Sequence, residues 1–123
     1  MADFKLTINK VLHFEGGFVN DPNDNGGETY CGISRKFWPD WGGWPIIDTG
    51  SFKVGDLVQL FYKINFWDKI GGDKIADQSI ADLLMDSAVN EGIVPAVKRA
   101  QSIVNVTQDG IISDTLISKL NSL

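Results

Sequence analysis

The chain has 123 residues, a length that fits one globular domain with a modest core. Its composition, 43% apolar and 11% aromatic, is that of a folded protein, and its net charge of −5 disfavours sequence-independent nucleic-acid binding, which depends on Lys and Arg. The single Cys31 excludes an internal disulfide, and the single His13 and Cys31 exclude the usual zinc ligand sets. We therefore expect no metal, no cofactor and no nucleic-acid partner.

No apolar run approaches the about 20 residues that span a bilayer, so we expect no stable membrane insertion. The first ten residues, MADFKLTINK, lack the uninterrupted apolar stretch of a secretory signal. We expect synthesis in the cytoplasm, and any action outside the membrane would then require a separate route of release.

The first predicted element is an amphipathic helix over residues 3–15. Glu15 lies near the middle of its apolar stripe, where another apolar residue would be expected, and Gly16-Gly17 ends the helix. We expect the apolar neighbours to desolvate the Glu15 carboxylate and so to raise its pKa. The stripe consists of Phe4, Ile8, Val11 and Leu12.

Residues 18–34 are predicted to form a loop or a short hairpin, because turn residues are dense and β-favouring residues follow them at 29–33. A second short helix is predicted to begin at Ser34. The segment 37–50 carries Trp38, Trp41 and Trp44 among prolines and glycines, and is predicted to be irregular.

The rest of the chain is predicted to form helices over 54–66, 76–90 and 94–105 and a last short helix ending at Leu123. Gly92 ends the second of these helices, Pro95 is tolerated in the first turn of the third, and Ser113 or Asp114 caps the last. The predicted fold is therefore α+β, mainly α. The residues expected to face inward are Val54, Leu57, Val58, Phe61, Ile64, Phe66, Ile80, Leu83, Leu84, Ala88, Val97, Ala100, Gln101 and Val104.

The segment 15–34, EGGFVNDPNDNGGETYCGIS, presents three candidate catalytic residues. Asp24 lies nine residues after Glu15, and Thr29 lies five residues after Asp24. Cleavage of a glycosidic bond needs a carboxylic acid of raised pKa and a second group that stabilises the oxocarbenium-like transition state or orients water. Glu15 fits the first role; Asp24, with Thr29 as a water-positioning hydroxyl, fits the second, and Asp21 is a weaker alternative. On spacing alone, these residues could also be ordinary helix-end and turn residues.

Two other interpretations of these residues are weaker. Asp21 to Gly26 matches the first half of a calcium-binding loop, but Gly32 occupies the position that requires a bidentate Glu. A Cys–His nucleophile pair from Cys31 and His13 is arithmetically possible, although most lone cysteines simply pack.

The segment 15–34 resembles the signature of glycoside hydrolase family 108, the phage-type N-acetylmuramidases, also described as secretion activators. It matches in the Glu followed by two glycines and an aromatic, in the Asp, in Gly-Gly-x-Thr and in Gly-Ile-Ser. Tyr62, Phe66 and Trp67 resemble the family's Tyr-x-x-x-Tyr/Phe-Trp motif, and residues 86–92 resemble its Asp-x-Ala-Val-Asn-x-Gly helix. Residues 93–121 resemble its predicted peptidoglycan-binding segment, so the resemblance covers nearly the whole chain.

The resemblance implies a small lysozyme-like fold in a single domain over 1–123, with a catalytic part at 1–91 and a peptidoglycan-binding-like helical segment at 92–123. It implies that Glu15 is the catalytic acid, and Asp24 and Thr29 carry over by position. The expected activity is that of a muramidase cleaving the β-1,4 bond of the peptidoglycan glycan strand. The resemblance also suggests an endolysin of a phage or prophage that reaches the bacterial cell wall through a holin.

Four further residues are predicted to contact the glycan strand: Tyr30, Trp38, Asp86 and Asn90. Trp38 could stack on a sugar ring or cover the core, and Asp86 and Asn90, four apart on one helix face, could face the cleft or fix the helix to the catalytic loop.

The sequence departs from the family pattern in two places: Cys31 stands where an aromatic is frequent, and Ser113-Asp114-Thr115 replaces Gly-Pro-x-Thr. Family members are also usually longer than this chain. Two other functions therefore stay open, a lytic transglycosylase that uses Glu15 alone and a non-catalytic wall-binding or secretion-related protein.

Overall fold

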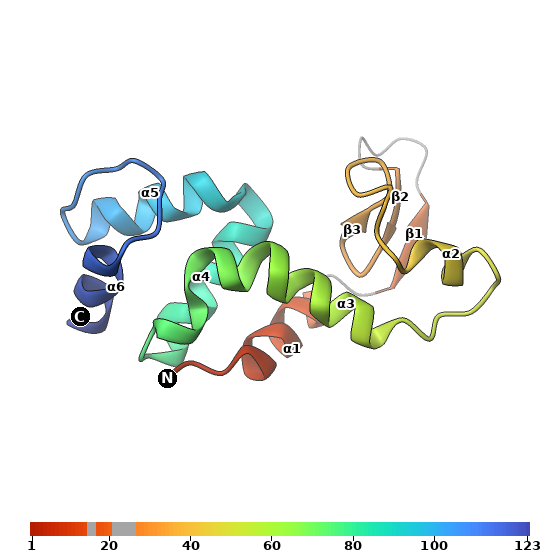
Figure 1. The fold of residues 1–123 in the computed structure, drawn as a ribbon, viewed down its shortest axis with the longest axis horizontal. Helices are drawn as coiled ribbons and strands as arrows, with labels where there is room; N and C mark the ends of the chain where they lie inside the picture. The colour runs from red at the N-terminus through yellow and green to blue at the C-terminus, as the bar shows by residue number, and fades with distance from the viewer. Residues whose placement is uncertain (15–16, 21–26) are drawn as a thin grey trace. The chain divides into compact units, whose positions relative to one another are not determined.

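The computed structural model describes residues 1–14, 17–20 and 27–123 (Figure 1). The regular elements of these residues are helices and a small antiparallel sheet, so the predicted mainly helical α+β fold is confirmed. The described residues form two compact units, Ile8–Phe61 and Met1–Thr7 with Tyr62–Leu123.

The elements in chain order are α1 (Phe4–Phe14), β1 (Phe18–Asn20), β2 (Glu28–Tyr30), β3 (Ile33–Ser34), α2 (Trp44–Ile47), α3 (Gly55–Tyr62), the π-helix η1 (Lys63–Trp67), the 3₁₀ turns η2 (Asp68–Ile70) and η3 (Gly72–Lys74), α4 (Gln78–Glu91), α5 (Ile93–Ile103) and α6 (Asp114–Asn121).

The Ile8–Phe61 unit contains the sheet, whose strands lie in the order β1-β2-β3. Phe18 pairs with Tyr30, which in turn pairs with Ile33, while Thr29 lies between Val19 and Ser34. Successive side chains of a strand point to opposite faces, so the register sorts the sheet into two faces. One face carries Phe18, Glu28, Tyr30 and Ile33, and the other carries Val19, Thr29 and Ser34.

Cys31 and Gly32 form the two-residue turn between β2 and β3. Both have positive φ angles, 49° and 79°, as in a type I′ turn. Gly32 accepts this conformation at little cost, whereas a cysteine side chain rarely adopts it. Asn is the residue preferred at the first of these two positions.

We expect Cys31→Asn to raise the free energy of unfolding by about 0.5 kcal/mol, because Asn tolerates the left-handed conformation better than Cys does. Urea denaturation of the two proteins measures the difference. Cys31→Val provides the matched control, since a β-branched side chain at positive φ should lower stability. A gain in the Val variant equal to that in the Asn variant would contradict the turn assignment.

The prediction of a short helix that begins at Ser34 is wrong. Ser34 belongs to β3, and only a single turn follows it, closed by the Trp38 amide donating to the Ser34 carbonyl at 2.8 Å. Pro39 then disfavours a helical conformation of the residue before it. The first helix after the sheet is α2, which has Pro45 in its first turn, where proline is tolerated.

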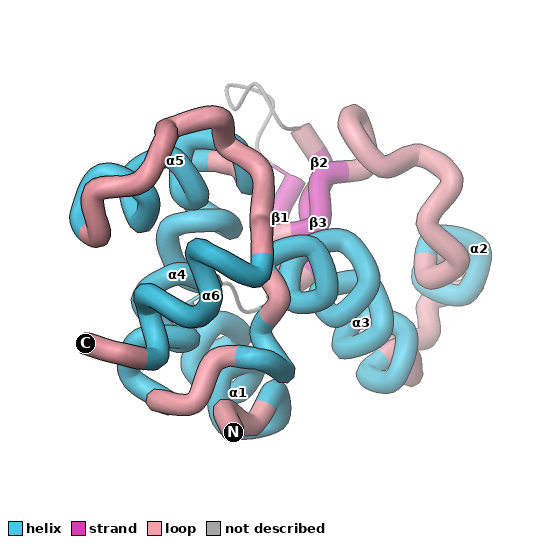
Figure 2. Tube along the Cα trace, turned by 60° about the vertical axis from the view of Figure 1, so that its left-hand side comes forward, coloured by secondary structure: helices cyan, strands magenta, loops and turns pink. Residues whose placement is uncertain are grey.

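The other unit is built around α4, α5 and α6, which lie side by side in Figure 2. The predicted helices are confirmed: Gly92 ends α4, Pro95 lies in the first turn of α5, and the Ser113 side chain caps α6 by accepting from the Leu116 amide at 3.1 Å. Leu83, however, is exposed rather than inward, because α4 packs through a neighbouring face. The buried residues of α4 are Ala81, Leu84, Met85 and Ala88.

The helix predicted over 54–66 is present, but it changes type near its end. The π-helix η1 follows α3 directly. Tyr62 and Trp67, five residues apart, are both fully buried. Residues five apart point about 140° away from each other in an α-helix, whereas the i→i+5 bonding of a π turn brings them to the same side. Ile64, which was expected inward, is consequently exposed.

Gln101, predicted to face inward, is a buried polar residue that fixes the turn after α5. Its side-chain amide donates to Asp109 Oδ1 at 2.7 Å and to the Ile111 carbonyl at 3.1 Å, and its oxygen accepts from the Gly110 amide at 2.9 Å. These bonds confirm the turn predicted at Asp109-Gly110. None of the helices in the described part of the chain has the length and apolarity needed to cross a membrane.

Candidate active site

Two of the three predicted catalytic residues, Glu15 and Asp24, lie outside the described residues, as does Asp21 with the partial calcium-loop match. The structure describes the elements on either side of them. Phe14, the last residue of α1, immediately precedes Glu15, and Asp24 falls in the segment between β1 and β2. The catalytic roles of both residues stay predictions.

Thr29 lies in the middle of β2, the central strand of the sheet, and is half-buried. Its backbone is paired on both sides, with Val19 and with Ser34. Such pairing restrains the backbone of Thr29, so the side-chain hydroxyl extends from a fixed position. Because Tyr30 is the next residue of the strand, its side chain lies on the opposite face of the sheet from Thr29.

The ring of Tyr30 is already engaged by two other aromatic rings. It stacks against Trp41, with centroids 6.5 Å apart, and against Phe52 at 5.5 Å. Burial raises the pKa of the Tyr30 phenol, and the neighbouring Cys31 raises it further, so the phenol is neutral at physiological pH. Tyr30 therefore lies at the centre of an aromatic cluster, and its contact with a glycan stays a prediction.

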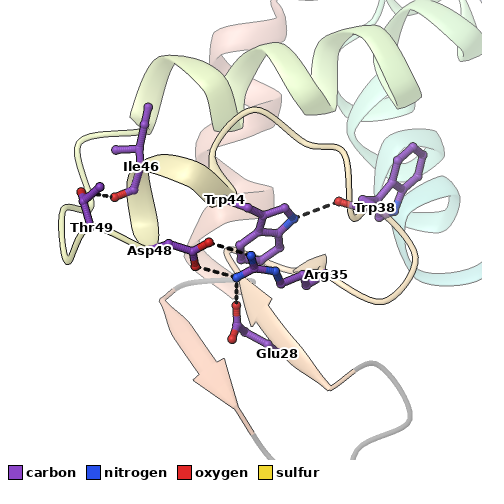
Figure 3. Close-up of polar contacts among 7 residues, drawn as sticks. All are labelled: Glu28, Arg35, Trp38, Trp44, Ile46, Asp48 and Thr49. Carbon is purple, nitrogen blue, oxygen red and sulfur yellow. Dashed lines mark hydrogen bonds and ion pairs between the residues drawn. The ribbon is translucent and has the colours of Figure 1, made fainter.

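Trp38 combines a packed side with an exposed one. Its ring lies edge-on against Phe61 at 4.8 Å, and its carbonyl accepts a hydrogen bond from Trp44 Nε1 at 2.9 Å (Figure 3). The side chain is nevertheless exposed enough to contact a ligand, whereas Trp44 is fully buried. The interpretation of Trp38 as a residue at the rim is compatible with this position, and its substrate contact stays a prediction.

An ion-pair network connects the β2–β3 hairpin to the end of α2 (Figure 3). The Arg35 guanidinium donates to Glu28 Oε1 at 2.8 Å and to both oxygens of Asp48 at 2.7 Å. It also lies over the Trp44 ring, 5.1 Å from the centroid. The hydrogen bonds from Arg35 hold the pKa of Asp48 below its ordinary value and raise the pKa of Arg35.

Sequence reasoning missed this network. The hairpin offered one signal: a two-residue turn at Cys31-Gly32 places Glu28 opposite Arg35, and the Arg35 amide does donate to the Glu28 carbonyl at 2.9 Å. Asp48 had no local signal, because its position depends on how the segment 37–50 folds back onto the hairpin.

The Arg35–Asp48 pair predicts a pH dependence of stability. The folded-state pKa of Asp48 is lowered from 3.8, so the pair stabilises the protein above that pH and loses this contribution as the pH falls through the folded-state pKa. Arg35→Met should therefore destabilise the protein more at neutral pH than at about pH 2, and should return the Asp48 pKa toward 3.8. Urea denaturation at both pH values and NMR titration of Asp48 measure the two effects, and an equal loss at both pH values would contradict the prediction.

Asp86 and Asn90 lie together on α4, in the other unit. Asn90 Nδ2 donates to the Asp86 carbonyl at 2.9 Å and to Asp86 Oδ1 at 3.0 Å, and both residues are exposed. They line the rim of a cavity of about 430 Å³ whose walls come from α4, α5 and the C-terminal residues. Asp86 and Asn90 thus bond to each other within α4, and their contact with a glycan or with the catalytic loop stays a prediction.

The sequence profile of the family Glycosyl hydrolase 108 matches residues 8–92. The chain belongs to glycosyl hydrolase family 108. The matched range contains every predicted site residue, and it ends before the segment 93–121. Family membership indicates a glycoside hydrolase whose substrate is a glycan such as peptidoglycan.

Structural comparison agrees with the assignment to glycosyl hydrolase family 108. The structure of SagA from Brucella abortus is similar, with a TM-score of 0.76 and 28% sequence identity over 98% of this chain and 69% of SagA. With its small sheet and mainly helical architecture, the chain has the lysozyme-like fold expected for the family. A search of curated proteins found no match.

Proposed function

We propose that the protein is an N-acetylmuramidase that cleaves the β-1,4 bond between N-acetylmuramic acid and N-acetylglucosamine in peptidoglycan. The observation that supports it best is the family match over residues 8–92, because that range includes the whole segment 15–34. The described elements also support it: α1 leads directly to Glu15, and Thr29 lies in β2, after the segment that contains Asp24.

In this mechanism Glu15 is the general acid and protonates the glycosidic oxygen as the bond to the leaving sugar breaks. Asp24 stabilises the positive charge that develops on the other sugar ring, as nucleophile or as base for the attacking water. Thr29 supplies a hydroxyl that orients this water. The fixed backbone of β2 supports the role of Thr29, since a hydroxyl on a central strand is restrained more tightly than one on a loop.

Analysis of the products tests the proposal. Purified protein is incubated with purified peptidoglycan, and the released fragments are examined by mass spectrometry. A hydrated reducing end on N-acetylmuramic acid is the expected result. A reducing end on N-acetylglucosamine would show cleavage of the other glycan bond, an anhydro end would show a lytic transglycosylase, and binding without fragments would show a non-catalytic wall-binding protein.

A further inference from the structure

Ring contacts run without interruption across one face of the sheet in the Ile8–Phe61 unit. Phe18 contacts Phe52 at 6.0 Å, Phe52 stacks on Tyr30 at 5.5 Å, and Tyr30 stacks on Trp41 at 6.5 Å. Trp41 then meets Trp44 edge-on at 5.2 Å. The aromatic row, as we call it, consists of Phe18, Phe52, Tyr30, Trp41 and Trp44.

Exposure is lowest at the Trp44 end of the aromatic row and highest at the two rings of the other end. Trp44 is fully buried, Trp41 and Tyr30 are half-buried, and Phe52 and Phe18 are 51% and 44% exposed. The two outer rings therefore lie on a packed aromatic base and still present apolar surface to solvent. Covering that surface would be favourable, by about 25 cal/mol for each Å² removed from water.

The charged side chains beside the aromatic row indicate which kind of ligand the row could bind. Glu28 shares the sheet face of Tyr30, and Arg35 joins it to Asp48, so that these three side chains carry a net charge of −1. The whole chain carries −5. An anionic membrane surface would be repelled, whereas the uncharged sugar rings of a glycan backbone have apolar C–H faces for the rings and hydroxyl and acetamido groups for the partly exposed Arg35 and Asp48.

We propose that the outer rings Phe18 and Phe52 form an accessory binding surface for the N-acetylated glycan strand. This surface lies on the sheet face opposite Thr29, so it holds the strand without taking part in bond cleavage. The inference rests on the proposed function, because that function supplies the glycan as ligand. It adds a second place of contact to the predicted catalytic residues.

The test uses the Glu15→Gln protein, so that the glycan is not cut, and measures its sedimentation with purified insoluble peptidoglycan. Changing both Phe18 and Phe52 to Ala should weaken binding roughly tenfold. Phe37→Ala is the matched control, since Phe37 is 65% exposed and lies outside the aromatic row, and it should leave binding unchanged. Equal binding by the double variant and the control would overturn the inference.

Two further variants separate ring stacking from general loss of structure. Phe52→Tyr keeps a flat ring and should retain binding, whereas Phe52→Leu keeps apolar volume without a flat face and should lose most of it. Thermal unfolding of each variant shows whether the fold is intact. Retained binding by a folded Phe52→Leu protein would contradict stacking on the sugar face.

Two additional measurements distinguish the possible failures. With Glu15 intact, a parent protein that releases no fragments refutes the proposed function, while loss of peptidoglycan binding in the double variant would still support the accessory surface. Release of fragments together with unchanged binding in the double variant refutes only the surface. Sedimentation with vesicles of anionic phospholipid tests the identity of the ligand. Vesicle binding that depends on Phe18 and Phe52 would overturn the assignment of the surface to a glycan and indicate a membrane instead.

Discussion

Replacing Glu15 with Gln is expected to lower the rate of peptidoglycan cleavage by roughly 10²–10⁴-fold, the usual contribution of a general acid. Gln has nearly the same shape as Glu but carries no transferable proton, so the leaving sugar oxygen would depart unprotonated. The initial rate of clearing of a peptidoglycan suspension measures the effect. Glu91→Gln is the matched control, because it removes the same charge from an exposed position on α4 that is paired with Arg99.

The proposed role of Glu15 would be wrong if its Gln variant cleared peptidoglycan as fast as the Glu91 control. Asp24→Asn then distinguishes the two kinds of enzyme. A hydrolase that uses a second carboxylate should lose activity, whereas a transglycosylase that uses Glu15 alone should keep it. Thr29→Val should have a smaller effect than either, because the hydroxyl orients water and carries no charge.

Replacing Trp67 with Ala is expected to lower the free energy of unfolding by about 3–5 kcal/mol. Trp67 is fully buried, its Nε1 donates to Asp73 Oδ1 at 2.8 Å, and its ring lies 5.6 Å from that of Phe4. The backbone of Gly72 closes over the indole so tightly that an added Cβ would come within 2.2 Å of the ring. The cavity left by Ala would therefore have rigid walls on this side.

Urea denaturation measures the loss of unfolding free energy, and Trp38→Ala is the control because it makes the same Trp-to-Ala change. Trp38 is partly exposed, so its removal should cost clearly less. Gly72→Ala should also destabilise the protein, by about 1–3 kcal/mol, because the new methyl group meets the indole. Equal losses for the two tryptophan variants would mean that the packing of Trp67 is not as tight as its surroundings indicate.

Periodicity and end signals were sufficient to predict most helices. Gly92, Pro95 and Ser113 act locally, through backbone conformation or a single hydrogen bond, and each has the predicted role. Which side of a helix is buried depends on its neighbours, and for this reason Leu83 was misplaced. Thr7 is buried at a polar position for a similar reason, because its hydroxyl donates to Asp82, 75 residues later, at 2.7 Å.

The candidate site shows the same division between local and distant information. The order of Glu15, Asp24 and Thr29 and the family resemblance could be recognised in a short segment, and the family assignment is confirmed. The contacts of Tyr30 with Trp41 and Phe52 could not, since they require the segment 37–52 to pack on the hairpin. The Arg35–Asp48 bond depends on the same folding back of the chain.

The π-helix at Lys63–Trp67 limits how the length of the chain can change in this region. A π turn accommodates one residue more than an α turn does, and deletion of a single residue here would restore regular α-helical bonding. That deletion would place Tyr62 and Trp67 four residues apart in a regular α-helix, so both side chains would stay on one side of the helix. The chain can therefore lose one residue at this turn and still bury both rings, whereas a deletion in a regular α-helical turn would rotate the residues after it by about 100°.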